Sequence, residues 1–321
     1  MKAVVYREYG SADVIRYEDV DVPTIGEDEV LVRVRAASLN FGDRAALHGI
    51  PGLIRLAFGL RRPKATVLGR DIAGTVEAVG SAVTRFQVGD AVLGEMEQRG
   101  FAQYVAAKER YLVGKPAGVT FEQAATLPVA ATTALQAMRL GEVGPGRRLL
   151  VNGATGGVGP FAVQLAKTLG AEVTAVCRTR NVEFVRALGA DHVVDRTRED
   201  VTKGSRRFDA ILDLTGDHPV SRFRRTLTRH GVFIASNGSG GRLVGPLPRL
   251  MTTAILSPFV SQRLRGLMSK RDLDDLAQLV ELVASGRLTP AIERTYPLAE
   301  TADAIRFVES EHPRGKIVLT V

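Results

Sequence analysis

A regular alternation of helix-like and strand-like segments, beginning near residue 120, constrains the fold more than any other feature. Short apolar runs such as RRLLVNG and EVTAVCR alternate with segments such as PFAVQLAKTLG, whose apolar residues recur at helical spacing. Strands that alternate with helices in this way form a parallel sheet with helices on both faces. The sequence therefore predicts an α/β protein in which residues 122–261 form a doubly wound, Rossmann-type domain.

The rest of the chain has a different pattern. Residues 1–121 contain the runs KAVVY, EVLVRVRAAS and DIAGTVEAVG, which are separated by turns and predict an irregular β-rich domain. The closing GKIVLTV predicts a strand that rejoins this sheet, so we expect one discontinuous catalytic domain of residues 1–121 and 262–321. Residues 242–270 mix proline with apolar residues without a clear period, and are interpreted either as a lid beside a site or as a subunit contact.

Composition excludes several classes of protein. A single cysteine, Cys177, cannot form an intrachain disulfide or an all-cysteine zinc site, which favours a reducing compartment. No apolar run reaches the roughly 18–20 residues that a membrane span requires, and the first residues do not resemble a secretory signal. The formal net charge of +8 is spread along the chain, without stacking aromatics between the basic residues. We therefore expect a cytoplasmic protein that binds neither nucleic acid nor membranes.

The sequence NGATGGVG at 152–159 lies between a predicted strand and a predicted helix, which is the setting of a dinucleotide-binding turn. Aligning Gly156 and Gly159 with the second and third glycines of that fingerprint leaves Ala154 at the first, the glycine of the tight turn. Backbone N–H groups at the start of a helix bind phosphate. We therefore predict a pyrophosphate site; the alternative is an ordinary glycine turn. The residues predicted to form it are Thr155, Gly156, Gly157 and Val158.

The end of the next predicted strand indicates which dinucleotide binds. Where an NAD site carries Asp or Glu for the ribose 2′-hydroxyl, this chain reads VTAVCRTRNV, without an acid and with two arginines. A guanidinium group can bond two phosphate oxygens at once. Arg178 and Arg180 therefore favour NADPH, with Thr179 as a hydroxyl donor; the alternative is that both arginines are solvated loop residues.

Several motifs in a fixed order make the chain similar to a known family. GRDIAGTVEAVGSAVTRFQVGDAVLG at 69–94, the turn GATGGVG and the closing GKIVLTV resemble the medium-chain dehydrogenase/reductase superfamily, whose catalytic domain is GroES-like. VCRTRNVEFVRALGADHVVD and YPLAETADAIRFVESEHPRGKIVL resemble its zinc-independent quinone oxidoreductase branch, which includes NADPH-dependent enoyl reductases. The resemblance covers nearly the whole chain and implies a cofactor in the cleft between the two domains.

The resemblance also implies a site without zinc. Zinc-dependent members carry a cysteine where this chain has Asn40, a histidine where it has Arg70, and a third ligand near Val129. Zinc prefers thiolate and imidazole ligands, so no metal site is expected. Asn40 is instead expected in the substrate and nicotinamide pocket; the alternative is a loop-capping asparagine. The other cofactor contacts carried over from the family are Thr133, Asn237, Gly238 and, near the phosphates, Lys316.

The sequence leaves two sources open for the proton that completes the reduction. Relatives often place a tyrosine or a lysine where this chain has Ala45, so the expected donors are His48 or solvent. The following segment, residues 50–66, has leucines at helical spacing beside basic residues. It predicts a helix that borders the substrate cleft, with a membrane-surface helix as the alternative.

The lack of zinc ligands constrains the reaction. Oxidising a simple alcohol requires something to stabilise an alkoxide, as a metal does, whereas a conjugated carbonyl needs only hydrogen bonds on its oxygen and a proton. We therefore expect NADPH-dependent hydride transfer to a quinone or an α,β-unsaturated carbonyl, by a homodimer of the kind common among relatives. The alternative is an NADPH-binding regulatory or RNA-associated protein with little turnover, suggested by Ala45 and the high charge.

Overall fold

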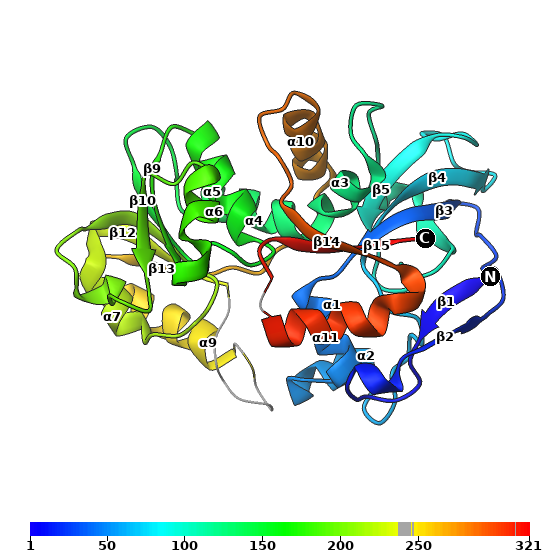
Figure 1. The fold of residues 1–321 in the computed structure, drawn as a ribbon, viewed down its shortest axis with the longest axis horizontal. Coiled ribbons are helices and arrows are strands. Elements are labelled where there is room, and N and C mark those ends of the chain that lie inside the picture. The colour runs from blue at the N-terminus through cyan, green and yellow to red at the C-terminus, as the bar shows by residue number, and fades with distance from the viewer. Residues whose placement is uncertain (237–244, 246, 312) are drawn as a thin grey trace. The chain divides into compact units, whose positions relative to one another are not determined.

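The computed structural model describes all residues except 237–244, 246 and 312 (Figure 1). It divides into two compact units, residues 1–132 with 271–321 and residues 133–270. The sequence predicts boundaries at 121/122 and 261/262, and both differ for a structural reason. Helix α3 (Phe121–Ala125) packs on strands of the first unit, whereas strand β13 (Arg263–Gly266) pairs with a strand of the second.

A parallel sheet forms the centre of the second unit. Among the described residues its strand order is β10-β9-β8-β11-β12-β13, which is the order of a Rossmann fold and confirms the predicted fold class. Every neighbouring pair in this sheet is parallel. The strands besides β13 are β8 (Arg148–Asn152), β9 (Glu172–Cys177), β10 (His192–Asp195), β11 (Phe208–Asp213) and β12 (Leu227–Ala235).

Helices connect these strands on both sides of the sheet. α5 (Gly159–Thr168) and α6 (Val182–Ala187) link β8 to β9 and β9 to β10, whereas α7 (Val220–Thr226) and α9 (Leu247–Leu256) follow β11 and β12. Because right-handed crossovers run in opposite directions from β8 and from β11, the two pairs of helices cover opposite faces (Figure 1).

Two segments of this unit differ from what their sequence patterns suggest. The helix-like pattern VSRFRRTLTRHG is helical only as far as Thr226, because Leu227 already pairs with Phe208 and begins β12. The segment 242–270, which has no clear period, contains helix α9 and an unexpected strand, β13. β13 has only four residues and pairs on one side, so its sequence carries little strand signal.

The first unit is built on an antiparallel sheet that a distant segment completes. Within the described residues the order is β14-β15-β3-β4-β5-β7, with β6 also paired to β3. The last strand, β15 (Lys316–Thr320), pairs antiparallel with β3 (Glu29–Ser38), which confirms that the chain end rejoins this sheet. The other strands of the unit are β1 (Lys2–Val5), β2 (Arg16–Asp19), β4 (Asp71–Val79), β5 (Ala91–Glu95), β6 (Tyr104–Lys108), β7 (Leu112–Gly114) and β14 (Ile292–Pro297).

Helices pack around this sheet or lead away from it. α3 continues into α4 (Thr132–Leu140) through a π-type turn at Leu127–Ala131, where Pro128 supplies no N–H to the regular helix pattern. None of the described helices has the length and apolarity to cross a bilayer. The remaining helices of the unit are α1 (Phe41–His48), α2 (Arg55–Phe58), α10 (Leu273–Ala284) and α11 (Thr301–Glu311).

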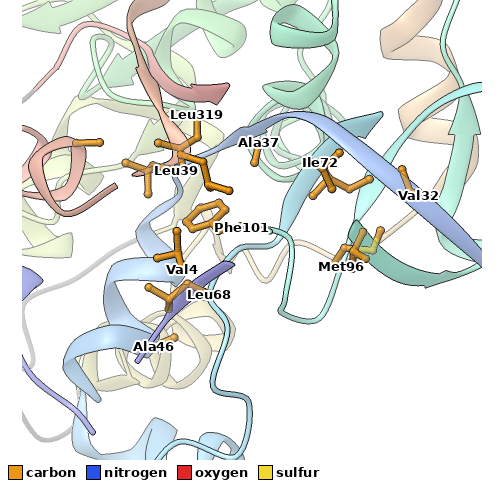
Figure 2. Packing of buried hydrophobic residues seen from close by; sticks show 14 of the residues in the cluster. Val4, Val32, Ala37, Leu39, Ala46, Leu68, Ile72, Met96, Phe101 and Leu319 are labelled. Atoms are coloured by element: carbon orange, nitrogen blue, oxygen red, sulfur yellow. The ribbon is translucent and has the colours of Figure 1, made fainter. Parts of the chain in front are cut away.

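A buried apolar cluster fixes the end of β3. Figure 2 shows Leu39 in this cluster beside Leu319 of β15, with Phe101 below them. Leu39 is only 6% exposed, and full burial of a leucine contributes about 1.5–3 kcal/mol. Because Leu39 is anchored in this way, the next residue, Asn40, starts helix α1 from a defined position.

Candidate functional site

The glycine turn of the second unit joins β8 to α5. Gly153 has a φ of +94°, so it is the residue that adopts the left-handed conformation of the tight turn. Ala154 is fully buried and its N–H donates to the Val176 carbonyl at 3.2 Å. The residue with positive φ in this turn is therefore Gly153, one position before the Ala154 that was aligned with the tight-turn glycine, and the alanine side chain packs inside.

The two glycines that follow have different surroundings. A Cβ placed on Gly156 meets no described atom within 4 Å, so backbone is open to a ligand there. A Cβ on Gly159 would lie 2.5 Å from the carbonyl carbon of Ala154 and from the Gly153 oxygen, so this glycine permits close packing of α5 on the strand. Val158 stands at the N-terminal end of the ten-residue α5. An open backbone at the positive end of a helix fits a pyrophosphate.

The predicted 2′-phosphate residues lie at the same edge of the sheet. Asn152 at the end of β8 pairs with Val176 of β9, and Arg178 follows two residues later. Arg178, Thr179 and Arg180 are all exposed in a short 3₁₀ turn. Cys177, just before them, is buried, and burial raises the pKa of its thiol to about 11, which suits a packing residue rather than a nucleophile.

A network of polar side chains, which was not predicted from the sequence, joins the carboxyl ends of β8 and β11. The amide nitrogen of Asn152 donates to Asp213 and to Asp217, each at 2.8 Å, and the fully buried Asp213 is ion-paired with Arg249 of α9. In a Rossmann sheet the strand order reverses between these two strands, and ligands bind outside their carboxyl ends. The only sequence signal was a polar residue at the end of each predicted strand.

In the first unit, Asn40 lies at the N-terminus of α1 and is bound to a buried lysine. Its backbone N–H donates to Asp43 at 2.8 Å, and Asn40 stands at the N-cap position of α1. Lys316 Nζ donates to the Asn40 side-chain oxygen at 2.6 Å and to the Leu39 carbonyl at 2.8 Å. The amide nitrogen of Asn40 makes a longer contact of 3.4 Å with the Ser38 carbonyl.

The surroundings of Lys316 are not those expected for a residue that contacts a cofactor phosphate. The residue is 2% exposed, and its ammonium is bonded inside the first unit. An ammonium that binds a cofactor phosphate must be accessible, so the phosphate role is corrected to an internal one. Sequence reasoning could not see this because the partners of Lys316 lie more than 240 residues away in the chain.

Asp71 completes the buried polar cluster of Asn40, Asp43, Asp71 and Lys316. One carboxylate oxygen of Asp71 lies 3.9 Å from Lys316 Nζ and accepts from the Val129 N–H at 3.3 Å. Burial raises the pKa of Asp71 to about 7 and lowers the pKa of Lys316, while their mutual attraction opposes both shifts. The cluster therefore places one cation and two carboxyl groups in a largely desolvated space.

The three positions that carry metal ligands in zinc-dependent relatives have other partners here. The Asn40 oxygen accepts from Lys316, the Arg70 guanidinium is ion-paired with Glu95, and the backbone N–H of Val129 donates to Asp71. An amide oxygen engaged by an ammonium, a guanidinium and an apolar side chain do not fit a tetrahedral zinc site.

His48 is not placed beside Asn40. The two residues stand at opposite ends of α1, roughly 12 Å apart by the rise of a helix. The ring nitrogen Nε2 of His48 lies 2.6 Å from a carboxylate oxygen of Glu309 on α11. This ion-pairing position gives no support to His48 as the proton donor.

The remaining site predictions are placed as follows. Thr133 is 7% exposed in the first turn of α4. Asn237 and Gly238 lie outside the described residues. The helix predicted over residues 50–66 is shorter than expected, because only Gly52–Ile54 and Arg55–Phe58 form helical turns.

Asp43 gives a testable pH dependence of stability. Burial raises its pKa to about 6, above the usual 3.8, although the Asn40 N–H opposes the shift. The folded state therefore binds more protons than the unfolded state between about pH 4 and 6, and this contribution to stability is lost as pH rises through 6. As the pH rises from 4 to 8, the free energy of unfolding of Asp43→Asn, measured in urea, should increase relative to that of the wild type by on the order of 1–3 kcal/mol. Asp21→Asn, at an exposed position, is the control. If the difference in stability from the wild type is independent of pH for both variants, the raised pKa of Asp43 is contradicted.

Comparison with known proteins agrees with this geometry. A model of the alcohol dehydrogenase GroES-like domain matches residues 26–135, and a model described as zinc-binding dehydrogenase matches residues 188–319. A chloroplastic quinone-oxidoreductase homolog of Spinacia oleracea is 34% identical over 99% of this chain and 98% of its own length. The chloroplastic NADPH-dependent alkenal/one oxidoreductase of Arabidopsis thaliana is 32% identical over 99% of this chain and 79% of its own.

A solved structure adds the fold. The quinone oxidoreductase from Coxiella burnetii matches with a TM-score of 0.89 and 30% identity, over 100% of this chain and 99% of that one. The sheet order, the glycine turn and the non-metal side chains at Asn40 and Arg70 are consistent with these relatives. The chain belongs to the medium-chain dehydrogenase/reductase superfamily, in its zinc-independent quinone oxidoreductase-like branch.

Proposed function

We propose that the protein is an NADPH-dependent oxidoreductase that transfers hydride to a quinone or an α,β-unsaturated carbonyl. The observation that carries this proposal is the pair of exposed arginines, Arg178 and Arg180, next to an open glycine turn at the end of a Rossmann sheet. The names of the relatives, quinone oxidoreductase and NADPH-dependent alkenal/one oxidoreductase, agree with it. They do not favour a binding protein with little turnover.

Each group of residues has its own role in this reaction. Backbone N–H groups of Gly156, Gly157 and Val158 would hold the pyrophosphate, and the two arginines would hold the 2′-phosphate. NADPH, when bound, supplies a hydride to the acceptor. The Asn40 amide donates to the acceptor's carbonyl oxygen, where negative charge develops as the hydride arrives. With Ala45 on α1 and His48 bound to Glu309, the proton that completes the reduction comes from solvent.

Activity is tested with a panel of quinones and enones, while NADPH oxidation is followed by absorbance. We expect turnover with at least one acceptor of each class, undiminished by a chelator, because neither Asn40 nor Arg70 offers a zinc ligand. The complete absence of turnover with all acceptors, or its loss when zinc is chelated, would contradict the proposal.

The cofactor preference should depend on the two arginines. Replacing both Arg178 and Arg180 with alanine removes charge-assisted hydrogen bonds, and we expect the Kd for NADPH to rise roughly 30-fold while the Kd for NADH stays unchanged. The quenching of NADPH fluorescence measures both. The matched control is Arg225→Ala with Arg229→Ala, two exposed arginines of the same unit. If the affinities for NADPH and NADH fall equally, the arginines act by general electrostatic attraction and not by binding the 2′-phosphate.

A cytoplasmic location and a homodimer stay predictions from the sequence. We propose the dimer as the form that carries the activity, because relatives of this branch are commonly dimers. Sedimentation velocity at several protein concentrations tests it, and a single species with the mass of one chain would rule it out.

A further inference from the structure

Three exposed leucines lie in the short segment that follows α1. Leu53 is 41% exposed, and Leu56 and Leu60 are each 67% exposed. They stand on the helical turns Gly52–Ile54 and Arg55–Phe58 and just after them. Single exposed apolar residues are ordinary on a protein surface, but three within eight positions indicate a contact surface.

The segment is held firmly to the first unit from its inner side. Phe58 packs against the apolar cluster of that unit. The Arg55 guanidinium stacks over the Tyr9 ring at 4.5 Å and donates to the Gly49 carbonyl at 3.0 Å. The leucines are therefore presented outward by a fixed support rather than by a loose loop.

Basic side chains follow the leucines directly. Arg61, Arg62 and Lys64 are exposed, and none of them forms a salt bridge to a described residue. Residues 44–70 contain six lysines and arginines and no aspartate or glutamate. Of these six, Arg44 and Arg70 are ion-paired with Glu309 and Glu95, so the positive charge beside the leucines comes from Arg61, Arg62 and Lys64.

A second exposed apolar stripe has no exposed basic residue on its own helix. Leu247, Met251 and Ile255 on α9 are 42%, 53% and 60% exposed. The arginine of that helix, Arg249, points away from solvent and is ion-paired with the buried Asp213. Charge thus distinguishes the leucine segment from this otherwise similar surface.

We propose that residues 52–64 dock the protein on an anionic lipid bilayer, with Leu53, Leu56 and Leu60 in the interface and Arg61, Arg62 and Lys64 at the lipid phosphates. Leucines beside basic residues match the apolar and anionic layers of such a surface. Two short helical turns offer no long regular face for a protein partner, whereas a bilayer requires no register. This proposal adopts the membrane-surface alternative given above for residues 50–66 in place of the expectation that the protein binds no membrane. It does not depend on the catalytic function.

Vesicle co-sedimentation tests the proposal with the full chain. We expect binding to vesicles of phosphatidylcholine with phosphatidylglycerol that weakens in high salt, and little binding to phosphatidylcholine alone. Reversing two charges in Arg61→Glu with Arg62→Glu should weaken binding at least about 25-fold, at about fivefold per basic residue removed. Leu56→Ser with Leu60→Ser should weaken it at least about tenfold.

Matched variants come from the second unit. Met251→Ser with Ile255→Ser removes comparable exposed apolar surface, and Arg225→Glu with Arg229→Glu removes the same charge; both should retain vesicle binding. Circular dichroism melts of all four variants confirm that each is folded.

Four results would overturn the proposal. One is no binding of the wild type to anionic vesicles, and another is an equal loss in the control variants. A third is a change in oligomeric state on Leu56→Ser with Leu60→Ser while vesicle binding persists, which would make a second copy of the chain the occupant. The fourth is a higher KM for a soluble acceptor without weaker vesicle binding, which would assign the leucines to the substrate cleft.

Discussion

Replacing Lys316 with methionine is expected to lower the free energy of unfolding by about 3–5 kcal/mol at pH 8, because Asp71 is then left buried without its cation. The lysine is 2% exposed and the aspartate is fully buried, so water cannot take over the lost interaction. The pKa of Asp71 is raised to about 7 by burial, so at pH 5 the carboxyl group is protonated and the loss should be smaller. Urea unfolding at the two pH values measures both effects.

The double variant Lys316→Met with Asp71→Asn is the control for this prediction. It removes both charges, so most of the stability should return. If the double variant is no more stable than Lys316→Met at pH 8, the packing of the lysine stem rather than the charge pair supplies the stability. The variant Lys115→Met tests a partly exposed lysine of the same unit, whose ammonium donates to the Pro116 and Val119 carbonyls and forms no salt bridge with a buried carboxylate among the described residues, and it should cost far less.

Replacing Gly156 with valine is expected to raise the Kd for NADPH at least about 100-fold without changing stability by more than about 0.5 kcal/mol. A side chain there meets no described atom, so the fold tolerates it, but it occupies the space in which a phosphate approaches the backbone. Fluorescence titration with NADPH and thermal unfolding of the same samples give the two numbers.

Gly159→Ala, in contrast, should lower the stability of the fold. Its new Cβ would lie 2.5 Å from Gly153 O and from the Ala154 carbonyl carbon, so α5 must shift away from the strand, at a cost of about 1–3 kcal/mol. Gly204→Val, in an exposed loop where the nearest atom is 3.8 Å away, is the neutral reference. Equal NADPH affinities for wild type and Gly156→Val would remove this turn from the cofactor site.

Local patterns in the sequence were sufficient for most of the second unit. A strand, a glycine turn and a helix are each encoded by neighbouring residues, so β8, the turn and α5 were predicted correctly. The residue with positive φ, Gly153, lies one position before the Ala154 that was aligned with the tight-turn glycine, because a fingerprint counts glycines whereas the structure selects the residue that must have positive φ. β13 was missed because an edge strand of four residues has a weak signal of its own.

The buried polar cluster could not be predicted in the same way. Asn40, Asp71 and Lys316 come from three distant segments that meet only because β15 pairs with β3 and β3 pairs with β4. Sequence similarity gave Lys316 the role of a phosphate contact, which requires exposure, and burial depends on the residues that surround a side chain in space. The same holds for His48, whose partner Glu309 is 261 positions away.

The sequence by itself determined the Rossmann and GroES-like architecture, the family, the glycine turn between β8 and α5, and the absence of zinc-ligand side chains at Asn40 and Arg70, because these depend on residue types and short-range spacing. Only the tertiary structure decided that Lys316 is an internal cation bound to Asn40, and that Leu56 and Leu60 face solvent beside arginines that form no salt bridge with any residue the structure describes. The physical reason is that burial and charge pairing are properties of chain segments brought together by folding, and no local pattern records them.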